Sequence, residues 1–224
     1  MKEKIGIIAG GELDEGFLLP FIEKEAFDYM IAVDGALAFT HQHGIRIQCL
    51  VGDFDTIDSD TLAQYIDRQE LYVEQHVPQK DETDTELAMH IAMAREPEKI
   101  ILLGGAGGRL DHFLGNLQVL LQPMIAGIPC TMVDRWNRIQ LHDRSFTLQK
   151  ATQYGTYVSL IPWSSKVENL SLFGFQYPLS HVIMEQGNSL GISNEIREDE
   201  AQVCFDRGIL ICVESRDRKT SDKN

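Results

Sequence analysis

Two aspartates, Asp53 and Asp55, stand two residues apart directly after a short apolar run that ends in Gly52. Side chains at this spacing in an extended segment point the same way, so both carboxylates face one side. Such a pair suits a hard divalent cation whose other ligands are waters and phosphate oxygens. Because the chain has 34 acidic residues, similar pairs arise by chance. The position after an apolar strand is what makes this pair a predicted metal site.

A third acid, Asp84, lies where a helix is expected to begin. Thr83 and Glu86 have the spacing of a capping box, which places Asp84 in the first turn. An acid there complements the helix dipole. It can equally be a third metal ligand, with Lys80 close by to meet a phosphate. Spacing alone leaves both interpretations open.

Four of the five residues Gly104–Gly108 are glycine. The run follows an apolar stretch and precedes a helical pattern, a layout that directs backbone N–H groups toward an anion. It fits neither the GxGxxG dinucleotide fingerprint nor the GxxxxGK[ST] phosphate loop. We therefore predict an anion-binding loop of another kind, with Gly107 and Gly108 near the bound nucleotide.

Polar residues follow this loop directly. Arg109 is placed to clamp a phosphate through two hydrogen bonds, and Asp111 can bind metal, receive a proton or cap the helix. His112 fits a hydrogen bonder at the helix start better than a metal ligand. Asn116, one turn further, is either a helix-surface amide or a ligand contact. Asp34 ends another apolar run and is expected on the same rim. No Ser–His–Asp or Cys–His arrangement supports covalent catalysis.

The first 135 residues alternate between apolar runs and helical patterns, which predicts an α/β fold with a mostly parallel sheet, Rossmann-like, with helices on both faces. The predicted strands are Ile5–Ala9, Met30–Val33, Cys49–Val51, Leu71–Val77, Ile100–Leu103 and Pro129–Val133. The predicted helices are Gly16–Phe27, Ala36–His43, Ser59–Arg68, Asp84–Arg95 and Leu110–Ala126. Ligands bind at the carboxyl ends of the strands in such a sheet, where the residues above gather.

The pattern changes near Trp136, which predicts an α/β nucleotide-binding domain over 1–136 and an all-β sandwich or partial barrel over 137–224. The short runs are Arg138–His142, Ser145–Leu148, Thr156–Ile161, Val167–Leu172, Ser189–Ser193, Ala201–Phe205 and Ile209–Val213. Asp206-Arg207-Gly208 has the composition of a tight hairpin loop between the last two runs. No convincing helix is predicted in this part, and the charged tail Ser215–Asn224 is expected to fray.

The composition, 43% hydrophobic and 24% charged over 224 residues, is typical of a globular protein. A net charge of −14 makes nucleic acid a poor candidate partner. No stretch reaches the roughly 18 apolar residues of a membrane span. The four cysteines are scattered without a CxxC pair, which favours a reducing compartment. We therefore expect a cytoplasmic protein with no membrane partner.

Four motifs in order resemble those of bacterial thiamine pyrophosphokinases. They are Ala32-Val33-Asp34-Gly35, Gly52-Asp53-Phe54-Asp55-Thr56-Ile57, Lys80-Asp81-Glu82-Thr83-Asp84-Thr85-Glu86-Leu87-Ala88 and Gly107-Gly108-Arg109-Leu110-Asp111-His112-Phe113-Leu114-Gly115-Asn116-Leu117. Near the C-terminus, Gly191-Ile192-Ser193-Asn194-Glu195 is similar to the family's late Ser-Asn motif. The chain departs from the family mildly at Ala36 and Thr56. Tyr177 stands where some relatives carry a tryptophan that stacks on thiamine.

The resemblance implies a homodimer of two-domain subunits with thiamine held between subunits. It implies Mg²⁺-dependent transfer of the pyrophosphoryl group of ATP to thiamine, giving thiamine diphosphate and AMP. The implied roles are Mg²⁺ binding by Asp53, Asp55 and Asp84, a phosphate path along Lys80, Arg109 and Asp111, and thiamine contacts by Ser193 and Asn194. Thiamine is a cation, which suits an acidic chain. A related enzyme for another acceptor, such as a hydroxymethylpterin, and a non-catalytic nucleotide sensor are the alternatives.

Overall fold

The computed structural model describes residues 2–52, 72–75 and 82–218. The chain forms two compact units, Met1–Arg135 and Trp136–Asn224. The predicted helix Ser59–Arg68 and three predicted site residues, Asp53, Asp55 and Lys80, lie outside the described residues.

The first unit contains a parallel sheet, as predicted. Its strands are β1 Lys4–Ile8, β2 Tyr29–Val33, β3 Cys49–Gly52, β4 Tyr72–Gln75, β5 Lys99–Leu103 and β6 Cys130–Val133. They lie in the order β4-β3-β2-β1-β5-β6, and each neighbouring pair is parallel. All but the first residue of β1, β2 and β5 are buried. This is the pattern of strands covered on both faces.

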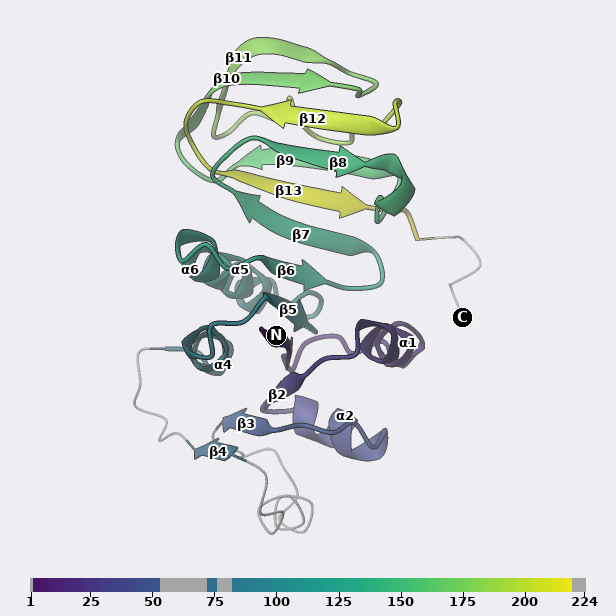
Figure 1. The fold of residues 1–224 in the computed structure, drawn as a ribbon, viewed down its shortest axis with the longest axis vertical. Coiled ribbons are helices and arrows are strands. Elements are labelled where there is room, and N and C mark those ends of the chain that lie inside the picture. The colour runs from purple at the N-terminus through teal and green to yellow at the C-terminus, as the bar shows by residue number, and fades with distance from the viewer. Residues whose placement is uncertain (1, 53–71, 76–81, 219–224) are drawn as a thin grey trace. The chain divides into compact units, whose positions relative to one another are not determined.

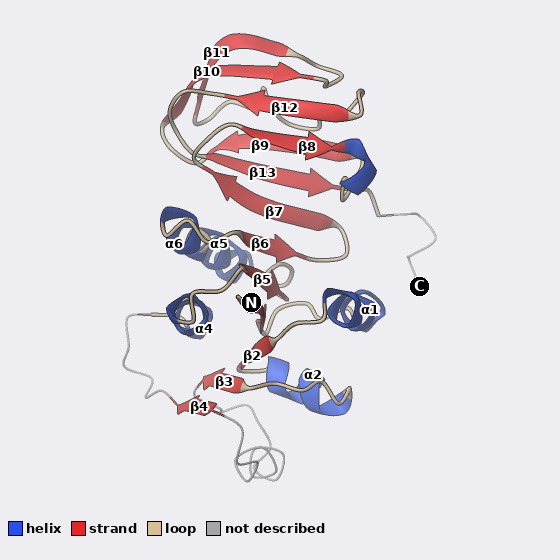
Figure 2. Cartoon of the chain, in the orientation of Figure 1, coloured by secondary structure: helices blue, strands red, loops and turns tan. Residues whose placement is uncertain are grey.

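Helices cover both faces of this sheet (Figures 1 and 2). α1 Glu15–Glu25 and α2 Ala36–Gln42 lie on one side, and α4 Asp84–Ala94, α5 Leu110–Val119 and α6 Leu121–Ile125 on the other. The predicted single helix Leu110–Ala126 is therefore two helices. Pro123 has no N–H to donate to Val119, so the helical hydrogen bonding is interrupted before it. Within the described part of the chain, no helix has the length and apolar character needed to cross a membrane.

The strand order reverses beside β1. The chain builds β2, β3 and β4 outward on one side of β1, then returns to place β5 on the other side. The chain segments that leave the carboxyl ends of β1 and β5 therefore run in opposite directions along the sheet. Open α/β sheets bind ligands in the crevice at such a switch point. The topology therefore selects the loops after β1 and β5 as the first place to look for a site.

The second unit is a sandwich of two antiparallel sheets (Figure 2). One holds β7 Asn137–His142, β13 Leu210–Ser215 and β9 Tyr157–Pro162, and the other β11 Leu179–Glu185, β10 Lys166–Phe173, β12 Glu200–Cys204 and β8 Phe146–Gln149. A buried core draws side chains from both sheets, among them Leu160, Leu170 and Val203. Between residues 136 and 218, the short 3₁₀ helix Lys150–Thr152 is the exception to the predicted lack of helix.

Two predictions for this unit were wrong, and one strand was missed. Asp206–Gly208 is no hairpin loop, because β12 and β13 belong to different sheets and the loop carries the chain between them. It instead pairs with β10, through the Glu168–Arg207 bridge. The run Ser189–Ser193 forms a turn and not a strand. β11 was not predicted at all. It is an edge strand with a single fully buried side chain, Met184, so it lacks a clear apolar alternation.

His142, at the end of β7, makes the stability of this unit sensitive to pH. Its ring stacks on Phe146 at 3.7 Å, and among the described residues its Nε2 atom has no hydrogen-bond partner. Burial lowers the pKa of His142 from 6.5 to about 4. The unfolded chain therefore binds a proton below about pH 6.5 that the folded protein does not bind until about pH 4. Stability must fall as the pH falls through this window.

We expect this histidine to remove roughly 3 kcal/mol of unfolding free energy between pH 7 and pH 4. A His142→Phe variant keeps the stacked ring and has no titrating group, so its stability should decline less by about that amount. Urea unfolding at a series of pH values measures the difference. Parallel pH profiles for the two proteins would contradict the prediction.

Candidate active site

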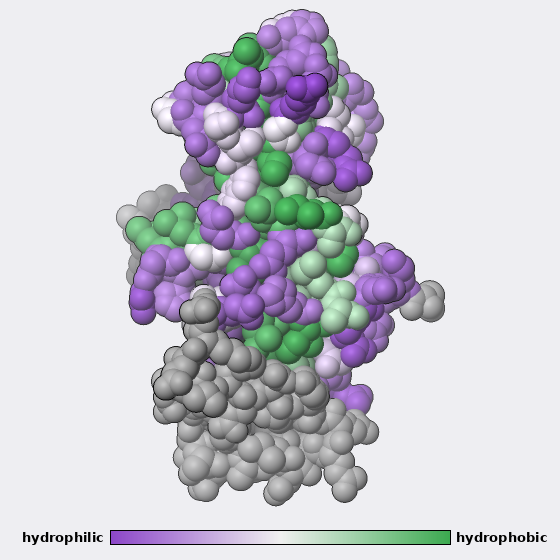
Figure 3. Space-filling model, turned by 90° about the vertical axis from the view of Figure 1, so that its left-hand side faces the viewer, coloured by the Kyte–Doolittle hydropathy of each residue, from purple (hydrophilic) through white to green (hydrophobic). Residues whose placement is uncertain are grey.

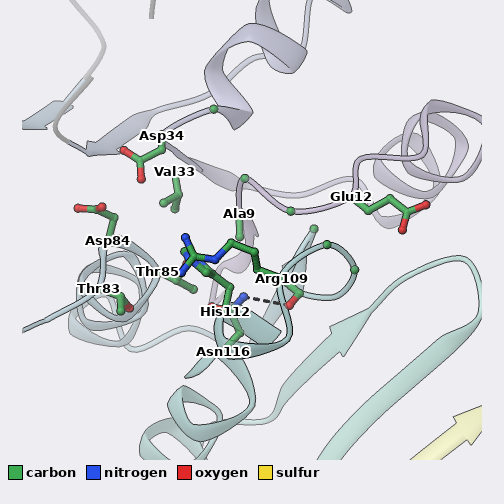
Figure 4. Close-up of a pocket in the computed structure, with 17 residues that line it drawn as sticks. Ala9, Glu12, Val33, Asp34, Thr83, Asp84, Thr85, Arg109, His112 and Asn116 are labelled. Atoms are coloured by element: carbon green, nitrogen blue, oxygen red, sulfur yellow. Dashed lines mark hydrogen bonds between the residues drawn. The ribbon is translucent and has the colours of Figure 1, made fainter. Parts of the chain in front are cut away.

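A cavity of about 830 Å³ lies at the carboxyl ends of the parallel strands, beside the switch point (Figure 4). Its walls come from the loops after β1, β2 and β5, the start of α4 and one side of α5. The lining residues are Ala9, Gly10, Gly11, Glu12, Val33, Asp34, Gly35, Thr83, Asp84, Thr85, Gly104, Gly105, Gly107, Gly108, Arg109, His112 and Asn116. The structure thus brings together seven of the predicted site residues: Asp34, Asp84, Gly107, Gly108, Arg109, His112 and Asn116.

The loops after β1 and β5 interlock through their backbones. Gly11 N donates to Gly104 O at 3.1 Å, and Glu12 N donates to Ala106 O at 3.4 Å. A Cβ on Gly11 would overlap the Gly104 carbonyl oxygen, so the close approach requires glycine. Gly107 (φ +88°) is similar, because a Cβ there would lie 2.6 Å from Glu12 Cβ. Replacing Gly107 would therefore disturb the loop itself and could not isolate a phosphate contact.

Asn116 on α5 holds the glycine loop through a side-chain hydrogen bond. Its side chain is 9% exposed, and Nδ2 donates to Gly105 O at 2.9 Å (Figure 4). The amide therefore supports the loop from inside α5 while it also borders the cavity. Of the two interpretations left open by the sequence, the helix-surface amide is wrong, because the side chain is buried.

Besides Glu12 in the loop after β1, two acids line the cavity, Asp34 and Asp84, and they come from different elements. Asp84 lies in the first turn of α4, which Thr83 caps by accepting a hydrogen bond from Glu86 N at 3.2 Å. Asp34 has a left-handed backbone (φ +44°) between β2 and α2. Its carboxylate fills the space where a Cβ of Gly52 would be, so the tips of β2 and β3 are in contact. Asp53 follows Gly52 in the sequence and lies outside the described residues.

The donor set of this cavity suits a hard cation. Asp34 and Asp84 offer carboxylate oxygens, the ligand type that Mg²⁺ prefers over nitrogen or sulfur. Within 2–52, 72–75 and 82–218, no three His, Cys, Asp or Glu side chains gather closely enough to hold a metal ion. Asp53 and Asp55 lie outside these residues, so the full predicted ligand set stays a prediction.

Arg109 pairs with Asp111 at the mouth of the cavity. Arg109 Nε lies 3.1 Å from Asp111 Oδ1 and Nη2 lies 2.5 Å from Oδ2, while His112 N donates to Oδ1 at 3.0 Å. The Arg109 guanidinium lowers the pKa of Asp111 to about 2. Both side chains are well exposed, so solvent screens the ion pair. Arg109 can therefore leave Asp111 for another anion at a small cost in free energy. Arg109 borders the cavity and Asp111 does not.

Some cavity residues were missed by the sequence interpretation. Neither Glu12 nor Thr85 was singled out, and Glu12 with Asp14 is one of the acidic pairs that can arise by chance in this chain. Asp14, the other member of that pair, caps α1 by accepting from Phe17 N at 3.1 Å. The available signal for Glu12 was its place directly after Gly10-Gly11 at the tip of β1.

The three predicted residues of the sandwich unit lie close together there. Asn194 is 5% exposed and hydrogen-bonds to both backbone polar groups of Tyr177. Tyr177 itself is 62% exposed. Ser193 is exposed, has a left-handed backbone (φ +56°) and donates its N–H to Ser159 Oγ at 3.0 Å. An aromatic side chain and a hydroxyl are thus presented at the surface, above a buried amide.

Comparison with known proteins matches both units. Residues 23–132 match the family model described as the catalytic domain of thiamin pyrophosphokinase, and residues 145–210 match its vitamin B1 binding domain. Over 215 residues the chain is 32% identical to thiamine pyrophosphokinase from Bacillus subtilis (strain 168), covering 95% of this chain and 99% of that protein. The chain belongs to the thiamine pyrophosphokinase family.

Solved structures agree with this assignment. The crystal structure of thiamine pyrophosphokinase from Bacillus subtilis aligns with this chain at a TM-score of 0.86 and 32% identity. The alignment covers 96% of this chain and 100% of the chain in that crystal structure. The thiamin pyrophosphokinase of Geobacillus thermodenitrificans covers 96% and 99%, with a TM-score of 0.83 and 32% identity. The predicted two-part fold of this thiamine pyrophosphokinase family member is confirmed.

The matched ranges can be compared with the cavity and with the predicted thiamine residues. The cavity residues from Val33 to Asn116 fall within the catalytic-domain match, and Tyr177, Ser193 and Asn194 fall within the vitamin B1 binding match. The loop after β1, Ala9–Glu12, precedes the catalytic-domain match although it forms one wall of the cavity.

Proposed function

We propose that this protein transfers the pyrophosphoryl group of ATP to the hydroxyl of thiamine, giving thiamine diphosphate and AMP. The observation that carries the proposal is the cavity at the β1/β5 switch point. It combines a glycine loop after β5, a cationic Arg109 and the acids Asp34 and Asp84. These are the groups that phosphoryl chemistry asks for, since the protein contributes mainly positioning and charge neutralisation.

The polyphosphate of ATP is placed against the glycine loop. A Cβ on Gly108 would meet no atom within 4 Å, so its backbone is accessible to a phosphate. Arg109 can form two parallel hydrogen bonds to a phosphate. Asp53, Asp55 and Asp84 would hold Mg²⁺, with Asp34 beside them and Lys80 as a further phosphate contact. When bound, Mg²⁺ would neutralise charge on the phosphates that separate.

The reaction exchanges one P–O bond for another. The thiamine hydroxyl oxygen forms a bond to the β-phosphorus, and the bond from that phosphorus to the α,β-bridging oxygen breaks, so AMP leaves with the bridging oxygen. The hydroxyl proton passes to a base, for which Asp111 and Asp84 are the candidates. While Arg109 pairs with it, Asp111 is a weak base, since its pKa is about 2. Movement of Arg109 onto a phosphate would remove that effect. Asp84 lines the cavity and Asp111 does not, and both acids stay candidates for the base.

Thiamine is assigned to the sandwich unit, near Tyr177, Ser193 and Asn194. We further propose a homodimer whose active sites are shared between subunits. Exposed leucines on α5, Leu110 and Leu114, support this because they lie one turn apart next to Arg109. Figure 3 shows hydrophobic groups at mid-height on the face that carries α5 and α6. A protein that sediments as a monomer while fully active would contradict a shared site.

A cytoplasmic location is also proposed. All four cysteines are free thiols, as is usual for proteins in a reducing compartment. Cell fractionation tests this, and recovery of the protein outside the cytoplasm would contradict it.

Incubation with ATP, Mg²⁺ and thiamine, followed by mass detection of products, tests the function. We expect thiamine diphosphate and AMP in equal amounts. Parallel reactions with a hydroxymethylpterin should yield no pyrophosphorylated pterin. Turnover of the pterin alone would reassign the acceptor. ATP binding without AMP formation from any acceptor would point to a nucleotide sensor.

Gly35 provides a test of where ATP binds. Its backbone is helical (φ −57°, ψ −16°), and a Cβ there would meet no atom within 4 Å, yet the residue lines the cavity. A Gly35→Leu side chain should therefore fill ligand space without straining the fold. We expect the Kd for a non-hydrolysable ATP analogue to rise about tenfold or more, as a 1.4 kcal/mol loss gives, with an unchanged Tm. Calorimetric titration measures the Kd.

Gly115 offers the matched control, because a Cβ there also meets nothing within 4 Å but the residue does not line the cavity. Gly115→Leu should leave the ATP analogue affinity unchanged. Equal affinities for the Gly35 variant and the unaltered protein would place the nucleotide elsewhere.

A further inference from the structure

We infer that Asn194 is a positioning residue for the acceptor, which acts by clamping the backbone of Tyr177 so that its exposed ring stays in one place. The inference rests on the proposed function, because it assigns the ring to binding a cationic aromatic acceptor. It changes the role expected for Asn194 from a thiamine contact to a support of the thiamine site.

The side chain of Asn194 is engaged inside the sandwich unit. Oδ1 accepts from Tyr177 N at 3.0 Å and from Glu195 N at 2.9 Å, and Nδ2 donates to Tyr177 O at 2.8 Å. Only 5% of the residue is exposed. The amide thus pairs with both backbone groups of Tyr177, as a neighbouring strand would. Little of it is left to contact a ligand directly.

The backbone of Asn194 is itself held rigidly by β9. Val158 N donates to Asn194 O at 2.7 Å, and Asn194 N donates to Val158 O at 3.0 Å. Leu160 N donates to Gly191 O at 2.8 Å, which fixes the start of the same turn. The clamp therefore connects the Tyr177 loop to a strand of the sandwich.

The clamped region presents an apolar and aromatic surface. Tyr177 is 62% exposed, and Leu190 and Ile192 in the nearby turn are 52% and 47% exposed. The face of an aromatic ring attracts a cation, and a ring that is already ordered loses less entropy on binding. A cationic heteroaromatic acceptor is the ligand class that this surface suits.

Asparagine is specifically required by this geometry. The clamp needs an acceptor for Tyr177 N and a donor for Tyr177 O on the same side chain. Aspartate supplies the acceptor but would face the carbonyl oxygen with a second negative oxygen. Alanine supplies neither group and leaves buried polar groups without partners.

Hydrogen–deuterium exchange of peptides spanning residues 174–178, combined with steady-state kinetics, tests the inference in the full-length protein. We expect Asn194→Ala to speed exchange of the Tyr177 amide about tenfold. The KM for thiamine should rise about tenfold, with the KM for ATP within twofold of its original value. Asn194→Asp should also show both effects, because it keeps the acceptor but places a negative oxygen against Tyr177 O.

Asn188→Ala is the matched control. Asn188 is exposed in the same segment, and its Oδ1 accepts a local hydrogen bond from Leu190 N at 2.8 Å. This variant should alter neither the exchange at 174–178 nor the KM for thiamine.

The outcomes separate the alternatives. A raised KM for thiamine with unchanged exchange would make Asn194 a direct contact and overturn the clamp. Faster exchange with an unchanged KM would show that the clamp does not serve the acceptor site, which also overturns the inference. If the unaltered protein makes no thiamine diphosphate, the proposed function fails, while the exchange data still report on the clamp.

Discussion

Replacing Asp84 by asparagine should lower kcat by about three powers of ten and leave the fold intact. The carboxylate lines the cavity from the first turn of α4, and Thr83, not Asp84, caps that helix. Loss of one cation ligand removes several kcal/mol of charge stabilisation, and each 1.4 kcal/mol corresponds to a factor of ten. Thiamine diphosphate formation at saturating ATP and thiamine measures the effect.

Glu86→Gln is the matched control for this variant. Glu86 is the other acid in the first turn of α4, so it interacts with the same helix dipole. It accepts from Gln122 Nε2 at 2.7 Å and does not line the cavity. Its activity should be unchanged. Equal losses in the two variants would show that Asp84 acts through the helix and not through a cation.

The same loss is expected for Asp53→Asn, which removes an acid outside the described residues. A raised Mg²⁺ concentration should partly restore the rate of both variants, because weaker metal binding is then compensated by mass action. Activity at the original level in Asp53→Asn at ordinary Mg²⁺ would remove that residue from the metal site.

Arg138→Met should destabilise the protein by about 3–5 kcal/mol, because it leaves a buried carboxylate without its cation. Glu214 is 1% exposed, and its Oε1 accepts from Arg138 Nε at 2.6 Å. Its Oε2 accepts from Tyr154 N at 2.9 Å, which is not enough to compensate a buried charge. Urea unfolding measures the free energy difference.

Two further variants make this prediction specific. Arg144→Met breaks an exposed ion pair with Asp143 and should cost less than about 1 kcal/mol. Arg138→Met combined with Glu214→Gln should recover part of the stability, because the unpaired charge is gone. A double variant that is less stable than Arg138→Met alone would contradict this explanation.

The parallel sheet was predictable because its strands are continuous apolar runs separated by helical periodicity. Sequence patterns failed where burial was weak or where pairing depended on distant residues. β11 has one fully buried side chain, so nothing in its pattern distinguishes it from a loop. The Asp206–Gly208 loop has hairpin composition, but its partner is Glu168 on β10. Composition can indicate that a turn forms, but it does not indicate which strand the turn pairs with.

The convergence of the site could also be predicted, because the carboxyl ends of parallel strands share one edge. Hydrogen-bond partners could not. Asn116 supports Gly105 from eleven residues away and Asn194 supports Tyr177 from seventeen, so spacing gives no indication of either pairing. In both cases the sequence singled out the residue without indicating its hydrogen-bond partner. The structure then shows that its amide holds the backbone of the loop beside it.

A structure of the protein with Mg²⁺ and a non-hydrolysable ATP analogue is the most direct test of the central claim. We expect the polyphosphate against Gly107–Arg109, Arg109 moved from Asp111 to a phosphate oxygen, and the cation between the phosphates and Asp84. A polyphosphate bound outside this cavity, with Asp84 turned away from the cation, would contradict the account.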